Sequence, residues 1–201
     1  MKTLGEVRKE ILVRLGFSDT QGHDNNKSLI DGIIEHAQNQ LFFQYDFLLN
    51  RKVANKAIVA GSTLYDFPTD CDYRQIVDVV ITNDSGKYVR LTNGINYLDE
   101  NIDERSIPVK YDVRDGQVLL NPVPDKGYTI RFEYYEKPAR LTQDADQLSL
   151  DDEIVFILAL IDIKNHYKMD SSTEQQQFKA QLDKKRDASL GQKRFYRKWR
   201  H

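Results

Sequence analysis

Four segments of the chain repeat their apolar residues at the spacing of an amphipathic helix. We predict helices over residues 3–15, 27–45, 152–169 and 173–190. The third is apolar on nearly every side between Ile154 and Ile163, so we expect it to be the most buried. The fourth carries few apolar residues, which predicts a helix that is solvated or faces a partner.

The stretch between the second and third helices, about residues 53–137, alternates apolar and polar residues and predicts a β insertion. Residues 109–113 form one strand, and Asp115-Gly116 predicts a two-residue hairpin because both positions must take a positive φ. With return strands at 117–120 and 128–136, this region predicts a three-stranded antiparallel meander.

Two further strand patterns precede this meander. Residues 57–59 and 64–67 flank Gly61-Ser62 and predict a hairpin, which Pro68 closes. Residues 76–81 are apolar except for Asp78, which predicts a strand buried on both faces.

The order of elements favours an α+β protein, with an N-terminal and a C-terminal helical pair packed together around an inserted antiparallel sheet of meander and hairpin type. We predict one domain over residues 1–190, with Gly191 ending the last helix, and a tail over 191–201. The 201 residues, 40% hydrophobic and 30% charged, suit a folded protein of this size. No apolar run reaches the length of a membrane span, so no membrane partner is expected.

Candidate catalytic chemistry is sparse. The four histidines are His23, His36, His166 and His201. None has a metal-ligand companion three or four residues away, and no phosphate-binding glycine loop is present, so no metal or cofactor is predicted. Cys71 lies between Asp70 and Asp72, whose charges should raise the pKa of its thiol and make it a poor nucleophile.

Carboxylate pairs leave a hydrolase open as an alternative. Asp99-Glu100 and Asp103-Glu104 could serve as the acid and base of a glycosidase, although no aromatic cleft signature accompanies them. Asp151-Asp152-Glu153 is better explained as favourable negative charge at a helix N-terminus. We therefore predict that the protein is not an enzyme.

The clearest functional signal is the charge of the C-terminus. Residues 188–201 carry five basic residues and no acid, which leaves −7 on the rest of a chain whose net charge is −2. Basic and aromatic residues alternate there, and the candidate partner-binding residues are Lys193, Arg194, Phe195, Tyr196, Arg197, Lys198, Trp199 and Arg200. Such a segment suits a protein groove that buries aromatic anchors, or nucleic acid through phosphates and stacking. The third interpretation is a frayed, solvated terminus.

Three stretches carry a family resemblance: LFFQYDFLLNRKVA, YDFPTDCDYRQIVDVVI and YDVRDGQVLLNPVPDKGYTIRFEYYEKPARL, followed by an apolar and then a polar helix. They resemble the head-to-tail adaptor proteins (connectors, or tail accessory factors) of tailed bacteriophages, especially short-tailed ones. The residues at positions comparable to the family's hairpin and exit strand are Gly116, Leu120, Pro122, Pro124, Tyr134 and Pro138.

This resemblance implies a structural virion protein at the neck of the particle, assembled in the cytoplasm of the bacterial host. It implies a homo-oligomeric ring, commonly a dodecamer, beneath the portal protein. The ring would extend the channel, through which genomic DNA would pass without sequence-specific binding. It would also present a surface to the next tail component (tail tube, nozzle or needle protein) for DNA ejection. The alternatives are a muralytic tail-associated hydrolase and a nucleic-acid-binding module acting through the C-terminal tail.

Overall fold

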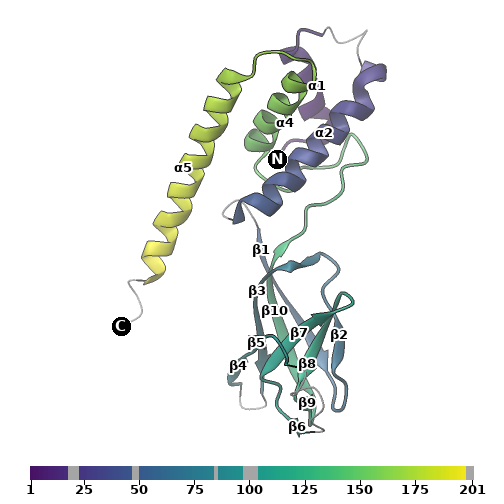
Figure 1. Cartoon of the computed structure of the whole chain (residues 1–201), viewed down its shortest axis with the longest axis vertical. Coiled ribbons are helices and arrows are strands. Elements are labelled where there is room, and N and C mark those ends of the chain that lie inside the picture. Colours follow the sequence, from purple (N-terminus) through teal and green to yellow (C-terminus); the bar gives the residue numbers. More distant parts are fainter. Residues whose placement is uncertain (18–22, 47–49, 84–85, 97–103, 198–201) are drawn as a thin grey trace. The chain divides into compact units, whose positions relative to one another are not determined.

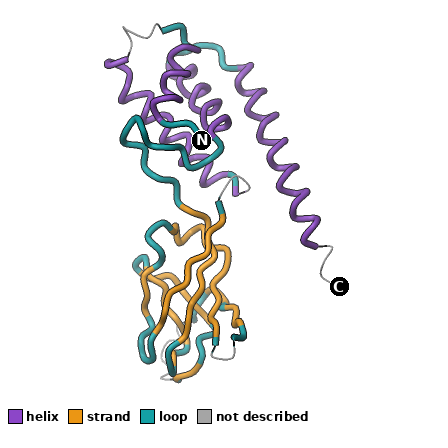
Figure 2. The backbone as a smooth tube through the Cα atoms, turned by 180° about the vertical axis from the view of Figure 1, so that it is seen from behind, coloured by secondary structure: helices purple, strands orange, loops and turns teal. Residues whose placement is uncertain are grey.

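The computed structural model describes residues 1–17, 23–46, 50–83, 86–96 and 104–197, with the backbone alone for 23–25 and 190–197. The chain forms two compact units, one of residues 1–49 and 138–201 and one of residues 50–137 (Figure 1). Helices make up the first unit and strands the second, as the backbone tube in Figure 2 shows. The predicted α+β class is therefore confirmed, while a single domain over residues 1–190 stays a prediction.

The helical unit contains α1 (Leu4–Arg14), α2 (His23–Gln44), α4 (Asp152–His166) and α5 (Ser172–Arg197). Helix α4 contacts each of the other three helices, and α1 also packs on α2. Nine residues of α4, at positions 154–161 and 163, are buried, as its apolar sequence predicts. Because no side of α4 faces water over most of its length, it forms the core of this unit.

Arg8 is the charged residue on which this unit is centred. It lies in α1 and is only 2% exposed. Its Nη1 donates to both carboxylate oxygens of Asp31 in α2, at 2.8 and 2.7 Å, and its Nη2 lies 2.7 Å from Asp144. Lys27 of α2 also contacts Asp144, at 2.9 Å. One guanidinium therefore joins α1, α2 and the segment that returns from the strands.

Gln38 of α2 holds both ends of that returning segment. It is completely buried; its Nε2 donates to the carbonyl of Ala139 at 3.2 Å, and its Oε1 accepts from the amide of Ser149 at 2.8 Å. Backbone hydrogen bonds join the same segment to the start of α1: Leu4 N to Asp146 O, Gly5 N to Asp144 O, and Leu148 N to Lys2 O. Two stretches far apart in sequence are thus closed into one helical unit.

The strand unit consists of two four-stranded sheets and a short two-stranded ribbon. In order across the first sheet, its strands are β1 (Arg51–Ile58), β10 (Tyr128–Glu136), β3 (Cys71–Thr82) and β4 (Tyr88–Arg90). The second sheet has β2 (Leu64–Asp66), β8 (Gln117–Asn121), β7 (Lys110–Arg114) and β5 (Thr92–Asn93). The ribbon pairs β6 (Arg105–Ser106) with β9 (Val123–Pro124). All pairs are antiparallel except β5–β7 and β6–β9.

The core of this unit lies between the inner faces of the two large sheets. Strand β10 alternates strictly over its first seven residues, with every second side chain from Tyr128 to Tyr134 buried. Val79 and Ile81 of β3 join these residues in one cluster with Val118 and Leu120 of β8. The two sheets therefore pack face to face around a shared apolar layer.

The predicted hairpin is confirmed, but the three-stranded meander is wrong. Strands β7 and β8 pair, and both turn residues take a positive φ, 49° at Asp115 and 77° at Gly116. Strand β10, however, pairs with β1 and β3 in the other sheet. Between β8 and β10 lie Pro122 and Pro124, which have no N–H to donate, so the chain leaves the β8 ladder and crosses to the first sheet.

Two further strand predictions are also wrong. Strands β1 and β2 do not form a hairpin, since they belong to different sheets. Strand β3 is buried on one face: Val79 and Ile81 are inside, while Asp78 and Val80 are only partly buried. The outer face of a sandwich sheet is open to solvent even where its sequence is apolar.

Gly191 does not end the last helix, as the sequence suggested, because α5 continues to Arg197. Strong helix formers lie on both sides of it, with Ala188 and Leu190 before and Gln192 to Arg194 after. A single interior glycine costs a helix only about 1 kcal/mol relative to alanine, so its neighbours outweigh it.

Replacing Arg8 with methionine should lower the free energy of unfolding by about 3 kcal/mol, because it leaves Asp31 without its buried partner. Urea unfolding followed by circular dichroism measures this loss. The control is Lys179→Met on the exposed surface of α5, where a change within about 0.5 kcal/mol is expected. Equal effects of the two substitutions would contradict the role given to Arg8.

Asp144 should make stability depend on acid pH. Hydrogen bonds from Arg8 and Lys27 lower the pKa of Asp144 to about 2 from an ordinary 3.8. Its contribution is complete above pH 3.8 and is lost as the pH falls through about 2. The stability difference between the natural chain and Asp144→Asn should therefore be largest near neutral pH and vanish below about pH 2. A pH-independent difference would show that the carboxylate charge plays no part.

Gly191→Ala should stabilise α5 by about 0.5–1 kcal/mol, since glycine in a helix interior is destabilising. The helical signal at 222 nm and its thermal unfolding measure this. The matched control is Gly16→Ala, which should destabilise because Gly16 ends α1 with a φ of 81°. A loss of helix in both variants would instead restore Gly191 as a helix end.

Candidate assembly surface

Helix α5 packs on the rest of its unit through one face. Phe178 lies edge-on to Tyr45, the residue that follows α2, with ring centroids 6.5 Å apart, and Gln181 donates to Glu153 of α4 at 3.0 Å. Near the start of the helix Glu174 pairs with Lys164 of α4 at 2.6 Å, and further along Lys185 pairs with Asp151. The contacting positions, 174, 178, 181 and 185, are four, three and four residues apart, which is a single helical stripe.

The Lys185–Asp151 pair marks the end of this packing. Asp151 is the N-cap of α4, where its carboxylate accepts from the amide of Ile154 at 3.2 Å. Burial opposes ionisation of Asp151, but the hydrogen bonds from Lys185 and Ile154 prevail and lower its pKa. The hydrogen bond that Lys185 donates to Asp151, and the charge of that carboxylate, raise the pKa of Lys185. Helix α4 starts here, so beyond this point α5 has no α4 turn beside it.

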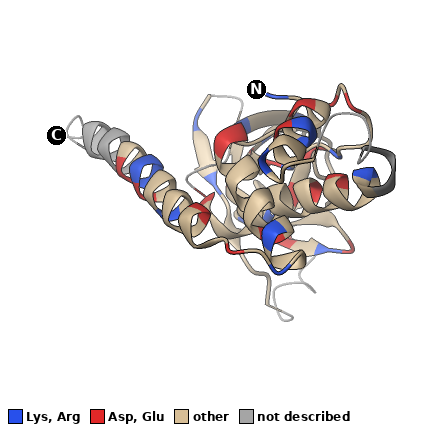
Figure 3. Cartoon of the chain, turned by 90° about the horizontal axis from the view of Figure 1, so that it is seen from above, with Lys and Arg blue, Asp and Glu red and all other residues tan. Residues whose placement is uncertain are grey.

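Beyond Lys185, α5 runs on through residues 186–197, about 18 Å of helix. Figure 1 shows this part extending past the other helices of its unit, and Figure 3 shows acidic and basic residues along the turns of α5 that precede it. Among the described side chains, Arg186, Asp187 and Ala188 are exposed, and the ion pairs of Arg186 are with Asp183 and Asp187 of the same helix. This segment is named the α5 arm below.

Five of the eight predicted partner-binding residues lie in the helical segment that forms the α5 arm: Lys193, Arg194, Phe195, Tyr196 and Arg197. Lys198, Trp199 and Arg200 lie outside the described residues. The residues expected in a separate tail therefore begin inside a helix. Tyr196 follows Phe178 by eighteen residues, about five helical turns, so its Cα lies on the line of the stripe that faces the other helices.

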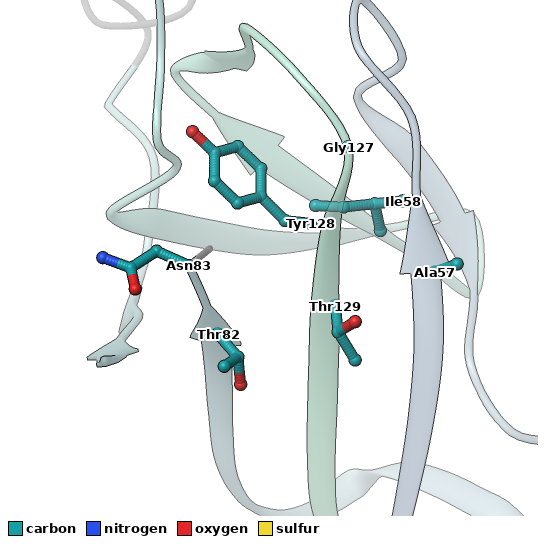
Figure 4. Close-up of a pocket in the computed structure, with 7 residues that line it drawn as sticks. All are labelled: Ala57, Ile58, Thr82, Asn83, Gly127, Tyr128 and Thr129. Carbon is teal, nitrogen blue, oxygen red and sulfur yellow. The ribbon is translucent and has the colours of Figure 1, made fainter. Parts of the chain in front are cut away.

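The surface pockets hold little chemistry. One depression of about 420 Å³ lies at one end of the first sheet, where Ala57, Thr82 and Thr129 are in register on neighbouring strands (Figure 4). Its one titratable lining residue, Tyr128, donates its hydroxyl hydrogen to Asp125. A groove of about 350 Å³ between α1, α4 and α5 has Phe156 on its floor, with Lys2 and Arg14 over the ring. Neither lining contains a nucleophile paired with a base.

The remaining candidates for catalysis do not converge. Across the described part of the chain, no three histidine, cysteine or carboxylate side chains are grouped to hold a metal ion. His166 stacks edge-on against Tyr167. Burial, followed by the charges of Asp72 and Asp70, raises the pKa of the Cys71 thiol to about 12, which confirms the predicted poor nucleophile. The pair Asp99-Glu100 and Asp103 lie outside the described residues, and Glu104 is exposed.

Sequence reasoning placed Asp151 at a helix N-terminus, where it is the N-cap of α4, but missed its pairing with Lys185, which fixes where α5 leaves α4. No local pattern identifies this pair, because it joins positions 34 residues apart. Within the described residues, no helix is long and apolar enough to span a bilayer.

Comparison with known proteins identifies the family. A family model described as SU10 adaptor protein matches residues 2–200. A search of curated proteins finds no match. The family match covers nearly the whole chain, including both units and the α5 arm, and an adaptor family indicates a structural rather than a catalytic role. The chain therefore belongs to the SU10 adaptor family and is a bacteriophage head-to-tail adaptor, a viral protein of virion assembly.

Proposed function

We propose that copies of this adaptor form a ring beneath the portal protein of a short-tailed phage, joining the capsid to the tail and extending the DNA channel. The observation that carries this proposal is the α5 arm, a basic helical segment that extends beyond the packing of its own unit in a chain of the adaptor family. A dodecamer would match a twelve-fold portal ring.

The α5 arm is the proposed anchor to the portal. Most helical stability in proteins comes from tertiary packing, so a helical segment that runs on past α4 gains from contact with another chain. Three aromatic residues, Phe195, Tyr196 and Trp199, are the type that dominates binding energy in protein interfaces. The five basic residues among them would pair with acidic groups around a portal groove.

The charge distribution supports a channel role for the rest of the chain. Outside residues 188–201 the chain carries a charge of −7, and like charge reduces adhesion of the DNA backbone to a channel wall. Genomic DNA would then pass without sequence-specific binding. The side of the ring away from the portal would receive the next tail component, such as a tail tube, nozzle or needle protein.

A ring also requires heterologous contacts between copies. Each subunit must offer two different patches, and the rotation between neighbours must close the ring. The finished ring would lie in the neck of the virion, after assembly in the host cytoplasm.

Co-sedimentation with the portal ring encoded by the same phage tests the anchor. We expect the full chain to co-sediment, and a chain ending at Leu190 to remain folded but fail to bind, because such a chain keeps all the described side-chain contacts of α5, up to the pair of Lys185 with the N-cap of α4. Single alanine substitutions of Phe195, Tyr196 or Trp199 should each weaken binding about tenfold or more. Circular dichroism checks that each variant is folded.

Two matched controls separate the possible outcomes. Lys179→Gln and Lys184→Gln remove exposed charges from α5 before the α5 arm and should leave binding unchanged. If the chain ending at Leu190 binds normally, the anchor lies elsewhere in the folded units. If neither chain binds, the portal role is wrong, and tests of peptidoglycan clearing and of salt-dependent DNA binding would address the two alternatives.

A further inference from the structure

Strand β1 has an open hydrogen-bonding edge. It is eight residues long and, among the described strands, pairs only with β10, so its other side carries unpaired backbone groups. Val53 is 48% exposed, and most of the strand is open to solvent. An open edge of this length is a template for adding a strand from another chain.

Two lysines occupy the inner face of this edge strand. Lys52 is in register with Tyr134 and Lys56 with Ile130, and both partners on β10 belong to the apolar core. The pleat therefore directs both lysines toward the interior side of the sheet. Inward charges on an edge strand are a known protection against strand addition, because pairing would bury them.

Both ammonium groups are held by oxygen atoms of the same unit. Lys52 Nζ lies 3.1 Å from a carboxylate oxygen of Asp70 and 2.5 Å from one of Glu136. Lys56 Nζ donates to the backbone carbonyl of Asp66, at 2.9 Å. Asp66 belongs to β2, the edge strand of the facing sheet, so Lys56 links the two sheet edges directly.

A tyrosine makes a third set of contacts, with the residues that follow β1. The hydroxyl of Tyr65, also on β2, accepts from the amide of Val59 at 3.0 Å and lies 3.1 Å from the carbonyls of Val59 and Ser62. Side chains therefore connect β1 and the residues that follow it to the 65–70 stretch at three levels. These contacts of Lys52, Lys56 and Tyr65 are named the β1 seam.

We propose that the open edge of β1 is a latent pairing surface for a second copy of this chain, and that the β1 seam keeps it closed. A second copy is the relevant occupant because an antiparallel β1–β1 pairing centred on Ala54 aligns the two inner faces and places Lys52 of each copy opposite Lys56 of the other. The four ammonium groups would then repel each other and lose their carboxylate and carbonyl partners. The closed edge matters most where many copies are held side by side, as the proposed ring requires.

The test replaces both lysines with threonine, a residue that favours strands. Sedimentation velocity on full-length Lys52→Thr/Lys56→Thr should show association beyond that of the natural chain at concentrations about tenfold lower. Hydrogen exchange should show the β1 amides slowed in those assemblies and not in assemblies of the natural chain. Thermal unfolding verifies that the variant monomer remains folded.

Two further variants make the result specific. Arg51→Thr/Arg131→Thr removes the same charge from the outer face of the same sheet and should behave like the natural chain. Lys52→Arg/Lys56→Arg keeps the inward charge and should also show no added association. The proposal is overturned if the threonine pair shows no added association, if the arginine pair associates equally, or if β1 amides are already slowed when the natural chain assembles. A natural chain that forms no ring would refute the proposed function while leaving this comparison intact.

Discussion

The burial of Arg8 is the constraint on which the helical unit depends. A guanidinium removed from water must be paired, and its two partners come from α2 and from the segment that follows the strand unit. The buried amide of Gln38 must also be hydrogen-bonded, and its partners are the backbone groups at the two ends of that segment. Helix α4 follows immediately, and its buried surface needs α1, α2 and α5 around it. The chain can therefore leave this unit for the 50–137 stretch and return without loss of its core.

The α5 arm has the opposite character. Up to Lys185 the helix has partners within its own chain, and after it the described side chains pair only within the helix. Glycine within the helix and a basic, aromatic end are features that the isolated chain does not need for its own fold. They suit a segment whose partner is another molecule, which agrees with membership of an adaptor family.

The strand unit shows how a multi-copy protein limits unwanted contacts. A sandwich of two open sheets always has edge strands. Here the longest described edge carries two inward lysines, of which Lys56 is bonded to the facing sheet. The opposite edge strand, β4, spans only three residues, and short edges give little template for pairing. Controlled assembly thus depends as much on edges that stay closed as on surfaces that bind.

The sequence by itself determined the elements whose cause is local. Apolar spacing predicted the four helices and the burial of α4, Asp115-Gly116 predicted the β7–β8 turn, and the flanking acids predicted the raised pKa of Cys71. Tertiary structure alone decided which sheet each strand joins, since alternation in β10 shows that one face is buried but not which strand lies beside it. It also decided the partners of Arg8, Gln38 and Lys185, and the helical state of Gly191. The strand partners and side-chain pairs depend on groups distant in the chain. The helical state of Gly191 depends on the summed helix propensity of its neighbours, which no short pattern contains.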